Sequence, residues 1–237
     1  MIQGIDVSKY QGKIDWNKVA ASGLVQFAYS KATENATSVD SQFKNNWNGM
    51  KDAGIIRGAY HFARTHNDPI KEANHFTTTV GSELLATDSL VLDIEESKLI
   101  GPPFINWVLA WLEQVEKTTG KIPIVYTYGP FFDTQDGNPS SEVIDKLLKY
   151  PLWLAAYTVN PDKYTPKVWK TVGWTIWQKS GNVAAPGDSI LYVPGINGAV
   201  DKNVFKGSLE DFKKFVLNLH TPLLGQIGEV FDLIADK

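Results

Sequence analysis

The 237-residue chain contains no cysteine, so neither a disulfide framework nor a thiol nucleophile takes part in its fold or chemistry. It has no basic run of the kind that nucleic-acid binding requires, and its formal net charge is only -3. No apolar run approaches the roughly 20 residues that span a bilayer. The first residues also lack the basic and apolar segments of a secretory leader. We therefore expect a cytoplasmic protein, or one exported by a route not encoded here, that binds neither nucleic acid nor membrane.

What the chain does contain is enough apolar and aromatic material for one sizeable core. Apolar residues make up 43% of the sequence, and it has eight Trp and nine Tyr residues. We expect most of the aromatic side chains in the core. A few of them are expected to form platforms on which sugar rings stack.

Short β-like segments alternate with longer helical segments along most of the chain. Helices are predicted near residues 15–22, 39–53, 69–85, 103–119 and 139–149. Strands are predicted at Ile2–Asp6, Gln26–Lys31, Ile56–Phe62, Ser89–Glu95, Pro123–Tyr128, Leu152–Ala156, Thr175–Gln178 and Ala199–Asn203. This alternation is typical of α/β proteins with a mainly parallel sheet. Eight strands would close a barrel, with five regular βα units followed by a less regular final third.

Asp93 and Glu95 follow an apolar run and are separated by one residue. In a strand, this spacing puts both carboxylates on one face while Leu92 and Ile94 point to the other. Burying two unpaired like charges is costly, so the pKa of one of them is expected to rise. Paired carboxyl groups with separated pKa values carry out glycosidic bond hydrolysis. The structural alternative is a helix N-cap acid followed by a solvated one.

Polar residues collect at the ends of the predicted strands, which is where barrel enzymes build their sites. They are Asp6, Lys31, His61, Asp93, Glu95, Tyr126, Tyr128, Gln178 and Asp201. An open sheet would usually carry a glycine-rich phosphate turn, and no GxGxxG or P-loop string occurs. Because the first and last strands of a closed barrel are neighbours, we expect Asp6 and Asp201 to face one another at the mouth that holds Glu95.

The histidines and serines show no familiar catalytic spacing. None of the four histidines belongs to HExxH or another metal-ligand pattern, and there is no GxSxG elbow. We therefore expect no metal, no cofactor and no serine triad. His61, at a strand end, is expected to line the site.

Seven motifs, in this order along the chain, carry a family resemblance. They are Asp6-Val-Ser-Lys-Tyr-Gln-Gly, Phe27-Ala-Tyr-Ser-Lys-Ala-Thr-Glu, Ala59-Tyr-His-Phe-Ala-Arg, Leu92-Asp-Ile-Glu, Trp153-Leu-Ala-Ala-Tyr, Ile176-Trp-Gln and Val200-Asp-Lys-Asn-Val-Phe. Over residues 1–219 the sequence resembles the family-25 glycoside hydrolases, the Chalaropsis-type lysozymes of bacteria and phage endolysins. The resemblance implies a modified TIM-like barrel, (β/α)5β3. It also implies cleavage of the β-1,4 bond between N-acetylmuramic acid and N-acetylglucosamine in bacterial peptidoglycan.

The resemblance assigns roles position by position. Glu95 corresponds to the general acid, and Asp93 to a nucleophile or, alternatively, to the acid that stabilises an oxazolinium intermediate formed from the substrate. Asp6 and Asp201 correspond to the two supporting acids. Groove residues are implied at Tyr60, Tyr126, Trp153, Tyr157 and Trp177, and strand-end position adds His61, Tyr128 and Gln178 as substrate contacts. We expect Asp93 to stay ionised beside a protonated Glu95.

Three segments depart from regular units. The loop at residues 133–141 is short and polar, whereas residues 180–198 form a long loop, expected to be a groove wall or lid, in which 184–192 look like an insertion. Residues 220–237 are expected to be a C-terminal helix or a linker. Endolysins of the family often carry a C-terminal wall-binding module, which we do not recognise in this sequence, and a linker would lead to such a module. The missing secretory leader and missing cysteines suit a phage endolysin, which we expect to stay in the host cytoplasm until lysis and then to act on the cell wall.

Two alternative functions remain. A chitinase-like N-acetylglucosaminidase would usually carry a DxxDxDxE string on its fourth strand, and that string is absent. A catalytically silent cell-wall-binding barrel is disfavoured by the four intact acids.

Overall fold

The computed structural model describes residues 1–181, 187 and 189–220. Its strands are β1 (Ile2–Val7), β2 (Phe27–Glu34), β3 (Ser38–Val39), β4 (Ile56–Phe62), β5 (Ser89–Asp93), β6 (Ile124–Thr127), β7 (Leu152–Ala155), β8 (Ile176–Ser180), β9 (Leu191–Tyr192) and β10 (Ala199–Phe205). Its helices are α1 (Trp16–Ala21), α2 (Phe43–Asp52), α3 (Pro69–Val80), α4 (Pro102–Thr119), α5 (Gly129–Gln135), α6 (Ser141–Leu148) and α7 (Leu209–Asn218), with 3-10 turns η1 (Lys9–Gln11), η2 (Pro161–Tyr164) and η3 (Lys167–Trp169). None of these helices has the length and hydrophobicity needed to cross a membrane.

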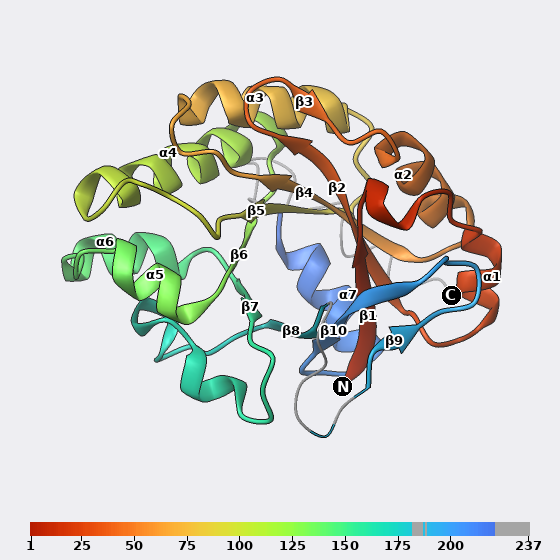
Figure 1. The fold of residues 1–237 in the computed structure, drawn as a ribbon. Coiled ribbons are helices and arrows are strands. Elements are labelled where there is room, and N and C mark those ends of the chain that lie inside the picture. Colours follow the sequence, from red (N-terminus) through yellow and green to blue (C-terminus); the bar gives the residue numbers. More distant parts are fainter. Residues whose placement is uncertain (182–186, 188, 221–237) are drawn as a thin grey trace, which may run out of the picture.

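Eight of the strands form a closed barrel, surrounded by helices (Figure 1). They follow the order β1-β10-β8-β7-β6-β5-β4-β2, and pairing of β1 with β2 closes the ring. Every neighbouring pair is parallel except the two that β10 makes, with β1 and with β8. The described part of the connection from β8 to β10 has no helix, and a parallel crossover generally needs one. The predicted α/β fold, a modified barrel of five βα units and three further strands, is confirmed.

All eight predicted strands are present, with ends shifted by a few residues, but the helices differ more. The helix predicted at 39–53 begins at Phe43, because residues 38–39 form β3 against β2. The helix predicted at 69–85 ends at Val80, where Gly81 has a φ of 88° that other residues rarely adopt. Helix α5 takes up part of the predicted 133–141 loop, and β9 lies within the predicted 180–198 loop. The tail Thr221–Lys237, and residues 184–186 and 188 of the predicted insertion, lie outside the described residues.

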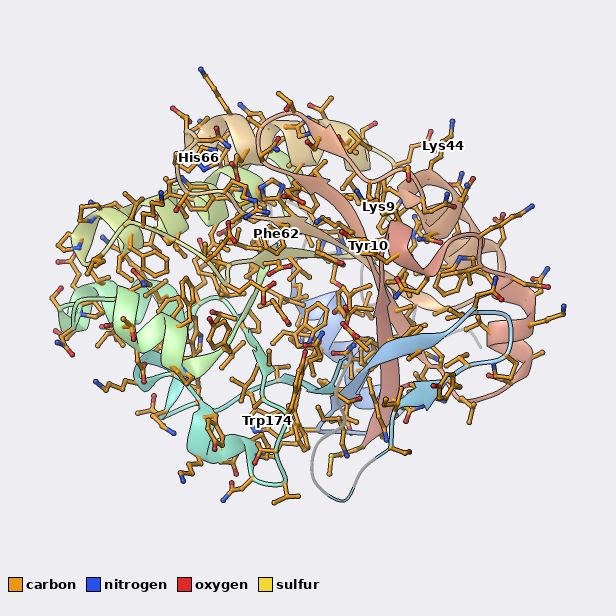
Figure 2. The ribbon with its side chains drawn as sticks, viewed as in Figure 1. Lys9, Tyr10, Lys44, Phe62, His66 and Trp174 are labelled. Carbon is orange, nitrogen blue, oxygen red and sulfur yellow. The ribbon has the colours of Figure 1, made fainter. Side chains whose placement is uncertain are left out.

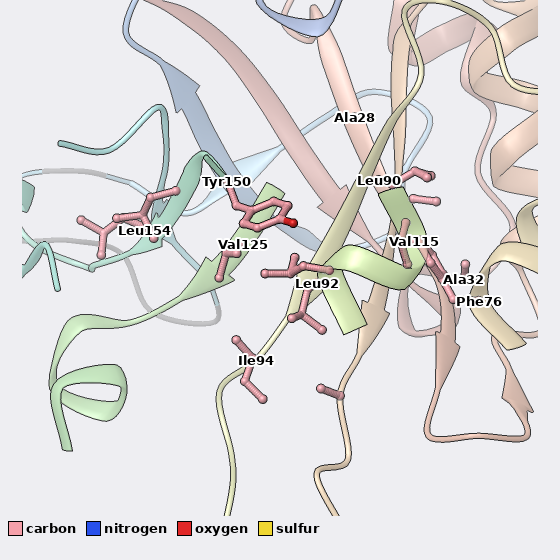
Figure 3. Packing of buried hydrophobic residues seen from close by; sticks show 14 of the residues in the cluster. Ala28, Ala32, Phe76, Leu90, Leu92, Ile94, Val115, Val125, Tyr150 and Leu154 are labelled. Atoms are coloured by element: carbon pink, nitrogen blue, oxygen red, sulfur yellow. The ribbon is translucent and has the colours of Figure 1, made fainter. Parts of the chain in front are cut away.

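The core has an outer and an inner layer, separated by the barrel wall. Leu90, Leu92 and Ile94 of β5 and the segment after it point outward, into a cluster that packs against the helices (Figure 3). Val91 points inward, into a second cluster filled largely by aromatic rings. Helix α7 contributes to this inner cluster through Phe212, whose ring lies 4.5 Å from that of Phe27. Period-two alternation along each strand therefore produces both layers.

One charged pair is buried between β4 and the loop before β5. Arg57 donates two hydrogen bonds of 2.8 Å to the carboxylate of Asp88 and a third to the carbonyl oxygen of Trp47. The two side chains are 3% and 1% exposed. The Asp88 carboxylate also accepts a hydrogen bond from the backbone of Leu85. This bidentate pair joins β4 to the segment that leads into β5.

Replacing Asp88 by alanine should therefore destabilise the fold strongly. Removing one partner leaves the Arg57 guanidinium buried without a counter-charge, which typically costs about 3 kcal/mol or more. We expect a clearly lower free energy of unfolding in chemical denaturation, and a Tm lowered by several degrees.

The matched control is Glu142→Ala, which removes an exposed ion pair with Lys146 on α6. Exposed pairs contribute little to stability, so this variant should unfold nearly as the parent does. Equal stability of the two variants would contradict the importance assigned to the buried pair.

Candidate active site

A cavity of about 480 Å³ opens at the mouth of the barrel, where the parallel strands end. Tyr10 and Phe62, which are labelled in Figure 2, belong to its wall. The lining residues are Asp6, Val7, Ser8, Tyr10, Gln11, Lys31, Tyr60, Phe62, Asp93, Glu95, Tyr126, Trp153, Gln178 and Asp201. All four predicted catalytic acids are among them, as are four of the eight predicted substrate contacts. The structure therefore brings together residues from both ends of the sequence.

The side chains of Asp93 and Glu95 point to the same side of the extended backbone, and both line the cavity. Asp93 is the last residue of β5, and the extended backbone continues past it, because Ile94 donates a 3.0 Å hydrogen bond to the carbonyl oxygen of Tyr126. Ile94 is thus packed in the outer core, while the residues on either side of it face inward. Asp93 is 6% exposed, and its Oδ1 is buried without a hydrogen-bond partner among the described residues.

Burial is the main cause of the raised pKa of both carboxyl groups. It raises the pKa of Asp93 well above its usual range, and the neighbouring charge of Glu95 raises it further. The pKa of Glu95 is also raised, first by burial and then by the charge of Asp6, while Lys31 and Arg64 oppose the shift. The raised pKa values agree with the expectation that burial of two like charges favours a proton on this pair. That Glu95 carries the proton while Asp93 stays ionised remains a prediction.

Asp6 and Asp201 are direct partners across the β1–β10 ladder. The sequence predicted that Asp201 ends its strand, and the structure corrects this: Asp201 is the third residue of β10. Because β10 runs antiparallel to its neighbours, its beginning rather than its end reaches the mouth. Burial, the charge of Asp6 and a hydrogen bond to Asp6 raise the pKa of Asp201 to about 8. Burial also raises the pKa of Asp6, and hydrogen bonds from Asn203 and Gln178 oppose that shift.

Five of the six predicted aromatic contacts line two hollows that have residues in common. Tyr60, Tyr126 and Trp153 line the main cavity. Tyr128 and Tyr157, which are 37% and 44% exposed, line an adjoining hollow of about 320 Å³ that Glu95 and Tyr126 share. Glu95 therefore stands where the two hollows meet, and binding of sugar by these rings stays a prediction.

Two predicted substrate contacts lie elsewhere. His61 is fully buried on the outside of the barrel wall, where it bonds to Thr33 at 2.7 Å and to Glu72 at 2.8 Å. Trp177 belongs to the outer core, and its ring nitrogen donates to the carbonyl oxygen of Ala156. Their strand neighbours Tyr60 and Gln178 face the cavity instead. Alternation explains both corrections, because adjacent residues of a strand point to opposite faces.

Several lining residues were not predicted as site residues, although they belong to quoted motifs. Tyr10 and Gln11 follow Asp6 in the first motif, and a capping box at Ser8 holds their 3-10 turn in place. Phe62 lies two residues after Tyr60, so period-two alternation would have identified it. Lys31, which was expected at a strand end but was given no role, is the one cation among the described lining residues. Its ammonium group bonds to Glu34 at 2.7 Å and lies 4.7 Å from the centre of the Phe62 ring.

In the described part of the chain, no group of three or more His, Asp or Glu side chains is arranged to hold a metal ion. The chemistry that the cavity residues themselves offer is that of carboxyl groups with raised pKa values, surrounded by tyrosine hydroxyls and amides. Such a set can give a proton to a leaving group and stabilise positive charge.

Comparison with known proteins gives a consistent family assignment. Residues 5–188 match the family described as "Glycosyl hydrolases family 25". The chain is 37% identical over 221 residues to the uncharacterized protein YegX of Escherichia coli K12, covering 91% of this chain and 73% of that protein. It is 34% identical over 217 residues to Lysozyme M1 of Streptomyces globisporus, covering 87% of this chain and 68% of that enzyme.

Solved structures agree. A bacterial lysozyme from Streptomyces coelicolor superposes with a TM-score of 0.79 at 30% identity, over 92% of this chain and 98% of that one. The CTP1L endolysin superposes with a TM-score of 0.71 at 26% identity, over 92% of this chain and 70% of that one.

The raised pKa of Asp201 predicts how stability changes with pH. Between about pH 4 and pH 8 the folded protein keeps a proton on this carboxyl group that the unfolded chain, with a pKa of about 3.9, has released. Stability should therefore fall as pH rises through this range. Asp201→Asn removes the contribution, so the fall in Tm between pH 4 and pH 8 should be less steep in the variant.

The control for this measurement is Asp52→Asn, at an exposed position on α2. Its Tm should follow the parent curve across the same pH range. A slope in Asp201→Asn that matches the parent would mean that Asp201 does not hold a proton in the folded state.

Proposed function

The chain belongs to glycosyl hydrolase family 25, and from this membership and the geometry of the mouth we propose that it is an N-acetylmuramidase of bacterial peptidoglycan. It hydrolyses the β-1,4 bond between N-acetylmuramic acid and N-acetylglucosamine. The observation that carries the proposal is the joint placement of Glu95 and Asp93 in one cavity, on the end of a fully buried strand. A chain that only bound the wall would have no need for a buried Asp93 whose pKa the neighbouring charge of Glu95 raises further.

Glu95 is the proton donor in this proposal. A general acid must be protonated near the working pH, and burial together with the charge of Asp6 raises the pKa of Glu95. Its position at the junction of the two hollows lets a sugar lie on either side of it. The bond to be cleaved then crosses Glu95, which protonates the leaving oxygen.

Asp93 supports the positive charge that develops on the sugar as the bond breaks. An opposite charge nearby favours the ionised form of a carboxyl group, so the developing oxocarbenium ion itself offsets the burial of Asp93. Asp93 lines the cavity, so its carboxylate can act on the substrate, either on the anomeric carbon as a nucleophile or on the acetamido group that closes an oxazolinium ring. Lys31 is the nearby cation that favours the ionised form before substrate arrives.

The test is mass spectrometry of borohydride-reduced fragments released from purified Gram-positive peptidoglycan. The parent chain should yield fragments that end in N-acetylmuramitol. Glu95→Gln keeps the shape of the side chain but cannot donate the proton, so its turnover should fall by a factor of about 100 or more while the fold is kept.

The other outcomes identify the alternatives. Reduced N-acetylglucosamine ends would mean a glucosaminidase. Near-parent turnover by Glu95→Gln would overturn the assignment of the acid. Retained binding to the wall with no fragments from either protein would favour a silent wall-binding barrel. Unchanged circular dichroism of Glu95→Gln is the control for folding.

We further propose that the enzyme serves as a phage endolysin, held in the host cytoplasm until lysis. The support is its structural similarity to the CTP1L endolysin over most of both chains. In this role the enzyme meets its substrate only when the inner membrane is breached, and the cell wall is then degraded from within.

Expression in a bacterial host whose wall the enzyme cleaves in vitro tests this role. Cells that make the parent protein should stay intact until a membrane-permeabilising agent is added, and should then lyse within minutes. Cells that make Glu95→Gln should not lyse at all. Lysis without permeabilisation, or recovery of the enzyme from the medium of intact cells, would contradict an endolysin role and favour an exported autolysin.

A further inference from the structure

The two amide side chains at the mouth, Gln178 and Asn203, both donate to the same carboxylate oxygen. Nε2 of Gln178 lies 2.9 Å from Oδ2 of Asp6, and Nδ2 of Asn203 lies 2.7 Å from that same atom. The partner carboxylate, Asp201, receives only a long contact of 3.4 Å from Gln178. Among the described residues, the amide donors therefore form short hydrogen bonds to Asp6 and only a long contact to Asp201.

The orientation of the Asn203 amide is fixed by the side chain of Trp153, which can donate a hydrogen bond but cannot accept one. The indole nitrogen of Trp153 lies 2.8 Å from Oδ1 of Asn203, and an indole N–H can only donate. The oxygen of the amide must therefore face Trp153, and its nitrogen must face Asp6. Trp153 and Asn203 are 2% and 0% exposed, so water does not compete for these positions.

The Gln178 amide is held from the other side by two tyrosines. The hydroxyl groups of Tyr126 and Tyr157 lie 2.9 Å and 3.0 Å from its Oε1. An amide oxygen accepts two hydrogen bonds, and an amide nitrogen donates two. The oxygen of Gln178 therefore accepts both of its hydrogen bonds within the protein, while its nitrogen donates to Asp6 and makes the long contact to Asp201.

We propose that Gln178 and Asn203 are positioning residues that confine the negative charge of the Asp6–Asp201 pair to Asp6 and leave the shared proton on Asp201. Two amide donors stabilise the ionised form of Asp6, because a hydrogen bond to a charged oxygen is about twice as strong as one between neutral groups. Asp201, directly opposite in the β-ladder, then donates its proton toward Asp6.

This arrangement acts on the catalytic acid through charge. Asp6 is the largest charged cause of the raised pKa of Glu95, so a charge fixed on Asp6 keeps Glu95 protonated. The titratable and charged groups that face the pair from the surrounding elements are Lys31 of β2, Tyr60 of β4, Asp93 and Glu95 at β5, Tyr126 of β6 and Tyr157 after β7. The link to Glu95 rests on the muramidase function proposed above, whereas the placement of the proton does not.

The direct test is carbon-13 NMR of the full chain labelled at aspartate Cγ and titrated from about pH 4 to pH 9. Signals of the pair are assigned with Asp6→Asn and Asp201→Asn. In the parent, Asp6 should be ionised and Asp201 protonated at pH 6. In Asn203→Leu, which removes one donor to Asp6, the apparent pKa of Asp6 should rise by about one unit, because one charge-assisted hydrogen bond is worth roughly that much. The apparent pKa of Asp201 should fall.

Two further variants secure the result. Tyr157→Phe, at a half-exposed position, loosens the hold on Gln178 without emptying the core, so it should give a smaller shift in the same direction even if Asn203→Leu does not fold. Gln114→Leu, on the outer surface of α4, is the control and should leave both signals in place.

Activity provides a second readout that separates this inference from the proposed function. The basic limb of kcat/KM against pH should move to lower pH in Asn203→Leu and Tyr157→Phe, while a loss of structure alone would lower the curve without moving it. An ionised Asp201 in the parent at pH 6, or unmoved signals in folded Asn203→Leu and Tyr157→Phe, would overturn the inference. A parent with the expected titration and no muramidase activity would overturn the proposed function and leave the inference standing.

Discussion

The mouth of this barrel depends on the position of β10, which pairs with both β1 and β8. These two pairings leave neither β1 nor β8 as an open edge. It also brings the beginning of β10, rather than its end, to the rim where the parallel strands finish. Asp201 comes to lie opposite Asp6 for that reason, although the two residues are near opposite ends of the chain. A parallel β10 would have carried the same carboxyl group to the other end of the barrel.

The alternation of side chains along β5 both fills the outer core and places carboxyl groups in the interior of the barrel. Leu90, Leu92 and Ile94 fill the outer core, and burial of each such side chain is worth about 1.5–3 kcal/mol. The residues between them face the interior, where the last of them are Asp93 and Glu95. The outward apolar residues thus offset the cost of holding the inward carboxyl groups away from water. Rigidity follows as well, because the strand that carries the acids has both faces buried.

Much of this could be predicted from the sequence, since the decisive signals are local. The Leu92–Glu95 spacing alone indicated that two carboxylates share a face. The alternation of strands with helices, and the polar residues at the strand ends, indicated the barrel. What local patterns could not indicate was the direction of β10, which depends on pairing between distant segments. Assigning His61 and Trp177 to the groove was wrong for a simpler reason, because strand-end position was considered without asking which face each side chain takes. Applying the period of two there would have chosen Phe62 and excluded both.

Four carboxyl groups line this mouth, and Lys31 is the one cation among the described lining residues. Bound protons, rather than cations, must therefore offset most of the negative charge of these carboxyl groups. Burial raises the pKa of all four, and each charge that remains raises the pKa of its neighbours. A site built in this way produces a protonated acid without any special partner for Glu95. It follows that the four groups act as one electrostatic unit. Replacing any one of the four carboxyl groups changes the proton occupancy of the other three. A loss of activity in a single variant therefore shows only that the residue belongs to the unit. The direction in which the pH profile of activity moves identifies the role of that residue.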